Sequence, residues 1–82
     1  MINWSKCPTV EQIPGKVSGA WVFKNTRLPL YVLFDNLAGG ATIYEFIDWF
    51  GGVSESEVSA VLAFTAQELR ADLVVADAHP VR

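Results

Sequence analysis

Cysteine is almost absent from this chain, since Cys7 is the only one among 82 residues. A single cysteine excludes an internal disulfide framework, so packing must hold the fold together. Long apolar runs are also missing, because no stretch approaches the roughly eighteen residues that a membrane span requires, and the N-terminus lacks the layout of a signal peptide. We therefore expect a cytoplasmic protein without a membrane partner.

Positive charge is scarce as well. Six Lys and Arg residues stand against nine Asp and Glu residues, which gives a formal net charge of −3. No strongly basic surface would attract nucleic acid from a distance, so DNA binding would need a local patch or a partner. Three basic residues near the N-terminus are the candidate phosphate contacts: Lys16, Lys24 and Arg27.

Side chains for catalysis or metal binding are equally few. His79 is the only histidine, and it lacks the Cys or carboxylate spacing of a metal site. Cys7 has no histidine nearby in the sequence to activate its thiol. Most carboxylates between residues 45 and 57 fall at helix starts, where they favour the helix dipole. We expect no catalytic, metal or cofactor residues and no small-molecule substrate, and hence a protein that is not an enzyme.

Apolar and aromatic residues are abundant instead, because 51% of the chain is hydrophobic and it contains three Trp, five Phe and two Tyr residues. A chain this short buries only about 60% of its unfolded surface. Part of the apolar surface should then stay exposed on a monomer, which favours a homodimer or another protein partner. The alternative is that a small core is simply rich in aromatic residues.

We predict one domain over residues 1–82, with a mainly α fold. A short β-ribbon segment is expected in residues 1–30, and three helices with a helix-turn-helix layout in residues 31–82. Trp21–Phe23 and Leu28–Leu30 have the composition of two short strands.

The turn between these two strands carries the sequence Asn25-Thr26-Arg27. Asn25 tolerates the positive φ of a tight turn, and Thr26 can form local hydrogen bonds. Pro29 cannot donate a ladder hydrogen bond, so it limits the second strand. Arg27 is expected either to pair with a helix carboxylate, Asp35 or Asp48, or to contact phosphate.

Three apolar stripes with helical spacing follow the ribbon. Thr42 with Glu45, and Ser54 with Glu57, form capping-box patterns that should begin the second and third helices. Glycine pairs should end the first and second helices. The inward residues are expected to be Leu30, Leu33, Phe34 and Leu37; Ile43, Phe46, Ile47 and Phe50; and Val58, Val61, Leu62, Thr65 and Leu69.

The third stripe continues to Ala76, before His79-Pro80. A helix of about 20 residues would be roughly 30 Å long, longer than its partner helices can cover. Its final part is therefore a candidate partner interface, although a frayed tail is the alternative. The interface residues would be Leu69, Leu73, Val74 and Val75.

In a helix-turn-helix protein the start of the third helix would enter the major groove of DNA. Here that start carries Glu55 and Glu57, which would repel phosphates. The helices are therefore better interpreted as a packing scaffold. The basic ribbon is the better candidate for a DNA contact.

Residues 13–64 resemble the domain-of-unknown-function 433 family of small bacterial proteins. The similarity rests on an apolar pair at Val22-Phe23, on Asn25-Thr26-Arg27 in place of a Gly-Thr-Arg turn, on a helix ending in Leu37–Gly40, and on the pattern from Glu45 to Phe64. Asn25 replaces the turn glycine, and Gly52 stands near the usual proline position.

This resemblance implies a homeodomain-like three-helix fold with an N-terminal β-ribbon. It also implies an antitoxin that neutralises a PIN-like toxin. A dimeric, DNA-binding autorepressor that uses the basic ribbon is the alternative function. Operator DNA would then be a second partner beside the toxin.

Overall fold

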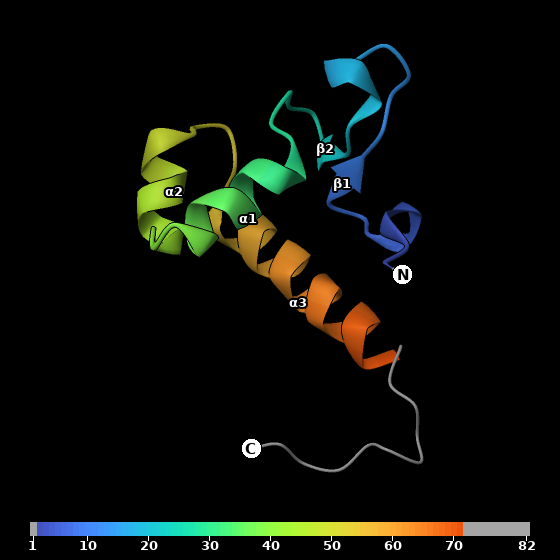
Figure 1. Cartoon of the computed structure of the whole chain (residues 1–82). Coiled ribbons are helices and arrows are strands. Elements are labelled where there is room, and N and C mark those ends of the chain that lie inside the picture. Colours follow the sequence, from blue (N-terminus) through green and yellow to red (C-terminus); the bar gives the residue numbers. More distant parts are fainter. Residues whose placement is uncertain (1, 72–82) are drawn as a thin grey trace.

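The computed structural model describes residues 2–71 of the chain, which form a mainly helical fold with a short antiparallel sheet (Figure 1). This confirms the predicted fold class. In chain order the elements are η1 (Trp4–Lys6), β1 (Val10–Glu11), η2 (Val17–Gly19), β2 (Val22–Phe23), α1 (Leu30–Ala38), α2 (Ile43–Trp49) and α3 (Glu55–Ala71), where η denotes a short 3-10 helix.

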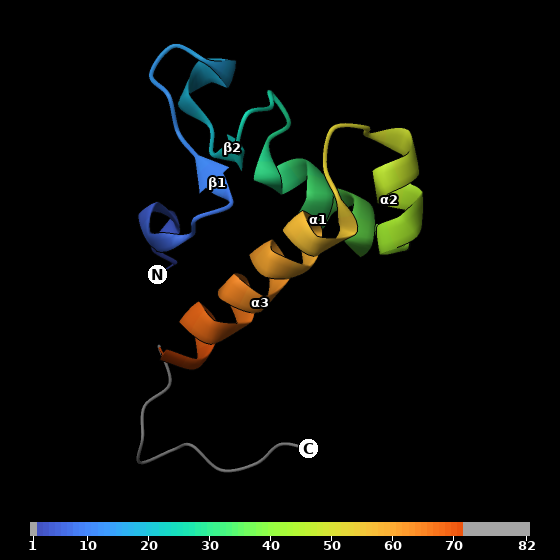
Figure 2. The same cartoon turned by 180° about the vertical axis from the view of Figure 1, so that it is seen from behind.

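The long helix α3 is the axis on which the other elements are arranged (Figures 1 and 2). Helices α1 and α2 lie at its N-terminal end, and η1 lies beside its C-terminal half. Two contacts hold η1 there: the rings of Trp4 and Phe64 lie 5.4 Å apart, and the Asn3 amide donates to Glu68 Oε1 at 3.0 Å. The N-terminal segment is thus fixed directly to the last described helix.

Both predicted capping boxes are present. At the start of α2 the Glu45 amide donates to Thr42 Oγ1 at 3.1 Å, and the Thr42 amide donates to Glu45 Oε1 at 2.8 Å. At the start of α3 the same pair of bonds joins Ser54 and Glu57 at 3.1 and 2.8 Å. Each box satisfies backbone N–H groups that a helix start otherwise leaves without a partner, so these local sequences fix where the helices begin.

The sheet differs in part from the prediction, because β2 pairs with β1 rather than with a strand at Leu28–Leu30. Pro29 forms only an isolated bridge with Val22, and α1 already begins at Leu30. Proline has no N–H to donate, and its fixed φ suits the residue before a helix, so a continuing strand is excluded here. Two hydrogen bonds still close the turn: Phe23 N to Leu28 O at 3.0 Å and Leu30 N to Trp21 O at 2.9 Å.

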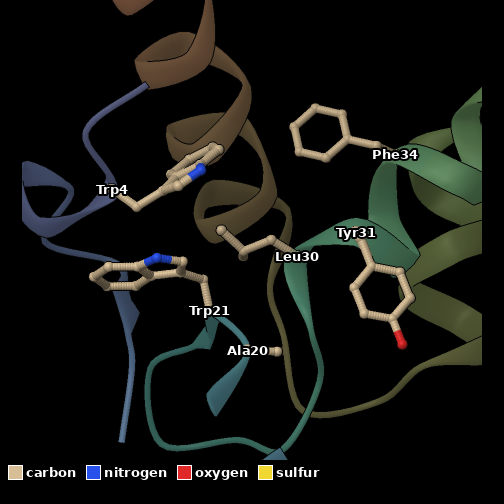
Figure 3. Close-up of a pocket in the computed structure, with 6 residues that line it drawn as sticks. All are labelled: Trp4, Ala20, Trp21, Leu30, Tyr31 and Phe34. Carbon is tan, nitrogen blue, oxygen red and sulfur yellow. The ribbon is translucent and has the colours of Figure 1, made fainter. Parts of the chain in front are cut away.

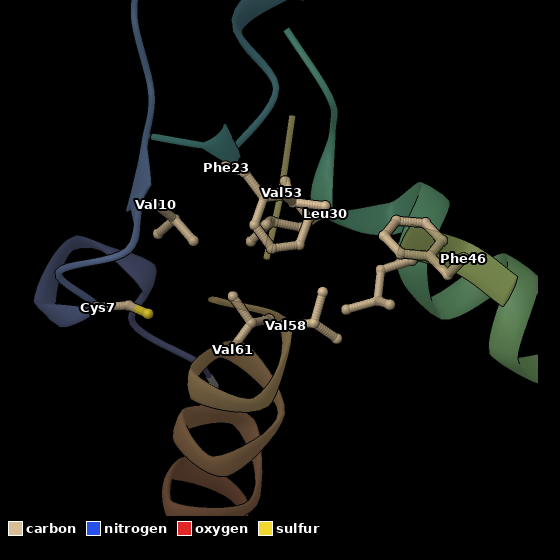
Figure 4. Close-up of a cluster of buried hydrophobic side chains, with 9 residues drawn as sticks. Cys7, Val10, Phe23, Leu30, Phe46, Val53, Val58 and Val61 are labelled. Carbon is tan, nitrogen blue, oxygen red and sulfur yellow. The ribbon is translucent and has the colours of Figure 1, made fainter. Parts of the chain in front are cut away.

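The core draws side chains from both the ribbon and the helices (Figure 4). Phe23 on β2 has no exposed surface, and neither has Phe46 on α2. Because the two rings belong to one apolar cluster, the ribbon cannot detach without exposing core side chains to water. The buried cluster consists of Cys7, Val10, Phe23, Leu30, Leu33, Phe46, Val53, Val58 and Val61.

The end of α3 departs from the expected inward stripe. Val58 and Val61 are buried as predicted, but Leu69 is 54% exposed. The prediction that Leu69 points inward is wrong because Phe64 and Glu68 are the residues in this part of α3 that contact η1, and Leu69 lies about 100° further round the helix than Glu68. Leu73, Val74 and Val75 lie outside the described residues. Among the described helices, none is long and apolar enough to cross a membrane.

Candidate functional site

The Asn25-Thr26-Arg27 turn has the predicted conformation. Asn25 has a positive φ of 65°. Thr26 Oγ1 donates to Phe23 O at 2.7 Å and accepts from the Leu28 amide at 3.0 Å. The threonine hydroxyl therefore bridges the two sides of the turn, which confirms its local structural role.

Glu11 anchors this turn, and sequence reasoning missed it. Its Oε2 accepts the Asn25 amide at 2.8 Å and lies 3.5 Å from Lys16 Nζ. The bond from the Asn25 amide, helped by Lys16 and Lys24, holds the pKa of Glu11 below its ordinary value of 4.5 although desolvation opposes the shift. The only signal in the sequence is that Glu11 is the sole carboxylate among the first 30 residues.

The three basic residues of the ribbon have different environments. Lys16 is half-buried beside Glu11, whereas Lys24 and Arg27 are exposed on the turn. The ion pair expected between Arg27 and Asp35 or Asp48 does not occur within residues 2–71. That expectation is wrong because Thr26 and Glu11 already fix the turn through hydrogen bonds to its backbone, without the guanidinium.

An aromatic pocket of about 250 Å³ opens between η1, the residues before β2, and the start of α1 (Figure 3). The indole rings of Trp4 and Trp21 lie one above the other on one side of it, and Phe34 and Tyr31 lie on the other side. No lining side chain carries a formal charge. The pocket is lined by Trp4, Ala20, Trp21, Leu30, Tyr31 and Phe34.

Each wall of the aromatic pocket is held by a separate contact. Trp4 packs against Phe64 of α3 at 5.4 Å between ring centroids. The Trp21 carbonyl accepts the Leu30 amide at 2.9 Å, which joins the second indole to the start of α1. Leu30 is 4% exposed and belongs to the core cluster, so it connects the pocket to the core. The pocket is therefore preformed by the fold rather than by loose side chains.

The rim of the aromatic pocket is less buried than its walls. Tyr31 is 60% exposed, and Asp35 stands one helical turn further along α1. An exposed ring at the mouth of a preformed apolar pocket is typical of a surface that another molecule covers. Sequence reasoning did not single out Trp4 or Tyr31, and it assigned Phe34 only to the inward face of the first helix. Their only signal was the high aromatic content of a small chain.

A second exposed aromatic region lies on α2. Tyr44 is 69% exposed and Trp49 is 57% exposed. The Tyr44 hydroxyl donates to Glu55 Oε2 at 3.0 Å, and this bond to a negative group raises the pKa of Tyr44. Neither residue lines the aromatic pocket.

Metal binding would require a cluster of ligand side chains. Within residues 2–71 there is no group of three or more His, Cys, Asp or Glu side chains that could hold a metal ion. Cys7 is buried, with its Sγ 3.3 Å from Thr9 Oγ1. Of the features found in this part of the chain, two are suited to binding another molecule: the aromatic pocket, and the turn that carries Lys24 and Arg27.

Comparisons with known proteins agree with the expected resemblance. A family model described as a protein of unknown function (DUF433) matches residues 10–65. The crystal structure of a DUF433 member protein from Anabaena variabilis superimposes with a TM-score of 0.65 and 24% sequence identity. This match covers 77% of the present chain and 62% of the Anabaena chain, and at this identity it supports the fold alone. No protein with a curated description matches.

Proposed function

Because this chain belongs to the DUF433 family of proteins of unknown function, we propose its role from its surface: it is a non-catalytic, antitoxin-like protein that neutralises a PIN-like toxin by binding it. The observation that carries the proposal is the preformed aromatic pocket with an exposed tyrosine at its rim. Aromatic residues in a fixed apolar depression are the usual anchors of protein interfaces.

Leu69 on α3 extends the proposed interface. It is 54% exposed, and its neighbour Glu68 contacts the Asn3 amide beside Trp4. We propose that the partner covers the exposed end of α3 as well as the aromatic pocket. Leu73, Val74 and Val75 would be further interface residues of a cytoplasmic homodimer.

Co-expression with the product of the adjacent reading frame tests this function. The wild-type chain should relieve the toxicity of that product and co-purify with it. Leu69→Ser should weaken the complex because it removes exposed apolar surface, while Ile13→Ser, which changes an exposed apolar residue between β1 and η2, should leave it intact. Failure of the wild-type chain both to relieve toxicity and to co-purify would refute the proposal.

DNA binding by the ribbon is the second candidate function. The observation that favours it is that Lys24 and Arg27 are both exposed on a turn whose backbone is fixed by Glu11 and Thr26. Because the backbone of this turn is already ordered, Lys24 and Arg27 could contact phosphates without a further loss of backbone entropy on DNA binding.

Salt dependence distinguishes this second function. Operator affinity should fall with salt concentration, and Arg27→Ala should reduce the slope of log K against log salt by about 0.9, the value for one lost phosphate contact. Lys6→Ala is the matched control, because Lys6 is exposed on η1 and away from the turn. A slope that is the same in wild type, Arg27→Ala and Lys6→Ala would exclude Arg27 as a phosphate contact.

A further inference from the structure

We propose that the strap, residues 13–19 between β1 and β2, is a strained conformational switch. In the structure it holds Lys16 on Glu11, and when it relaxes it releases that lysine to contact phosphate. The phosphate role of Lys16 rests on the second candidate function, DNA binding by the ribbon. The strain itself does not depend on any partner.

The strap contains three consecutive residues in the left-handed region of the backbone. Val17, Ser18 and Gly19 have φ values of 52°, 54° and 78°. Glycine adopts this region freely, but a β-branched residue such as valine does so only as an outlier. Two-residue turns with positive φ at both central positions usually carry Asn-Gly, whereas this turn carries Val-Ser. Backbone strain of this kind persists only where other contacts enforce it, and it is concentrated at functional sites and switch regions.

Few contacts enforce this conformation of the strap. Gln12 Nε2 donates to Gly19 O at 2.7 Å, and Lys16 Nζ lies 3.5 Å from Glu11 Oε2. A charge-assisted hydrogen bond is normally about 2.7–2.9 Å long, so this ion pair is a weak one. Three further hydrogen bonds of 3.0 Å join backbone groups within residues 13–20. From outside the strap, the strain is thus opposed mainly by one side-chain hydrogen bond and one long ion pair.

The strap can move without disturbing the core. None of its residues belongs to the buried cluster or to the partly buried side chains that pack against it. In both views of the molecule it extends beyond β1 and β2 on the side away from α3 (Figures 1 and 2). The ribbon beside it is fixed, because the Lys24 amide donates to Thr9 O and the Leu30 amide to Trp21 O, both at 2.9 Å. The strap can therefore change conformation between two fixed ends.

Glu11 connects the strap to the turn that carries Lys24 and Arg27. Its Oε2 accepts the Asn25 amide at 2.8 Å and also faces Lys16 Nζ. The left-handed turn that follows Lys16 reverses the chain and keeps this lysine beside β1. When the strap adopts the usual negative φ values, the reversal is lost and Lys16 can leave, while Glu11 keeps its shorter bond to Asn25. Lys16 then becomes a third cation for phosphate, and the turn stays ordered.

Two substitutions at Val17 isolate the strain. Val17→Asn introduces a residue that tolerates positive φ, whereas Val17→Thr keeps the β-branched shape and with it the strain. Both replace an apolar side chain with a polar one, so they lose similar packing. Val17→Asn should melt roughly 4–8 °C higher than Val17→Thr, the shift expected in a chain of this size when one left-handed residue is relieved.

Hydrogen exchange of the full chain tests whether the strap opens separately. In wild type the amides of Gly19 and Ala20 should exchange at least about tenfold faster than those of Lys24 and Leu30, after correction for their intrinsic rates. In Val17→Asn the Gly19 and Ala20 amides should exchange roughly five- to thirty-fold more slowly than in Val17→Thr, because the closed strap is no longer strained.

Salt dependence tests the release of Lys16. The probe is a short double-stranded DNA of random sequence, because non-specific binding reports on phosphate contacts. Lys16→Ala should reduce the slope of log K against log salt by about 0.9 relative to wild type, the value for one lost phosphate contact. Val17→Asn favours the closed strap and should reduce the slope as well. Val17→Thr should keep the wild-type slope, and so should Lys6→Ala, since Lys6 is exposed on η1 and away from the strap.

Several results would overturn the switch. Equal melting temperatures and equal exchange in the two Val17 variants would show that the backbone is not strained at this residue. Exchange at Gly19 and Ala20 as slow as at Leu30 would show that the strap opens only when the whole ribbon opens. If DNA binds and Lys16→Ala keeps the wild-type slope, Lys16 stays on Glu11 and its phosphate role is wrong.

Failure of DNA binding itself is distinguishable from failure of the switch. If wild type does not bind the DNA, the second candidate function is wrong, and the phosphate role of Lys16 is wrong with it. The melting temperatures and the exchange rates are measured without DNA, so they still decide whether the strap is a strained switch.

Discussion

We predict that the ribbon and the helices fold as one domain. Replacing Phe23 tests this prediction. Phe23 lies on β2, has no exposed surface, and contributes to the same buried cluster as residues of α1, α2 and α3. Phe23→Leu leaves a partly filled cavity and should lower the free energy of unfolding by about 1–2 kcal/mol. At about 0.05–0.15 kcal/mol per residue, the whole chain should have a stability of only roughly 4–12 kcal/mol, so this loss is readily measured.

Urea unfolding followed by two signals gives the measurement. In a Trp49→Leu background, tryptophan fluorescence reports on Trp4 and Trp21 beside the ribbon, and far-ultraviolet circular dichroism reports on the helices. With a slope of about 1 kcal/mol per molar urea, both midpoints should fall together by about 1–2 M. Tyr31→Leu is the matched control, because Tyr31 is 60% exposed and should change the stability by less than about 0.5 kcal/mol. A fall in the fluorescence midpoint alone would show that the ribbon unfolds separately, and would refute the reasoning.

Three further predictions concern local structure. Asn25→Gly should change the free energy of unfolding by less than about 1 kcal/mol, whereas Asn25→Val should lower it by about 1–2 kcal/mol, because valine is strained at a φ of 65°; thermal unfolding would show the difference. Thr42→Ala removes the acceptor of the Glu45 amide and should lower the free energy of unfolding by about 1 kcal/mol in urea titrations, whereas Thr42→Ser keeps the acceptor and should lose much less. Because the folded pKa of Glu11 lies below its ordinary value of 4.5, its contribution to stability is present above that pH and is lost as the pH falls through the folded pKa. Melting temperatures between pH 6 and pH 3 should therefore fall less in Glu11→Gln than in wild type, and equal slopes would contradict the role of Glu11.

The helices could be predicted because their signals are local. Thr42 with Glu45 and Ser54 with Glu57 lie three residues apart, so their hydrogen bonds form wherever the helix begins. The turn at Asn25 was equally local, since positive φ is a property of the residue itself.

The failed predictions depended on residues distant in sequence. Val10–Glu11 forms a strand only because β2 pairs with it, and two residues carry no periodic pattern of their own. Which face of α3 is covered depends on how η1 packs against it, and η1 lies more than 60 residues from Leu69. The aromatic pocket likewise joins Trp4, Trp21 and Phe34 from three separate segments, so only the folded chain brings them together.

The affinity of the full chain for the product of the adjacent reading frame, measured by isothermal titration calorimetry, tests the central claim most directly. Wild type and Trp49→Leu should bind with similar affinity, and Trp21→Leu should bind about tenfold more weakly or worse, because a buried aromatic anchor dominates interface energy. Absence of binding by wild type would contradict the proposed antitoxin-like function. Equal binding by all three proteins would contradict the assignment of the aromatic pocket as its interface.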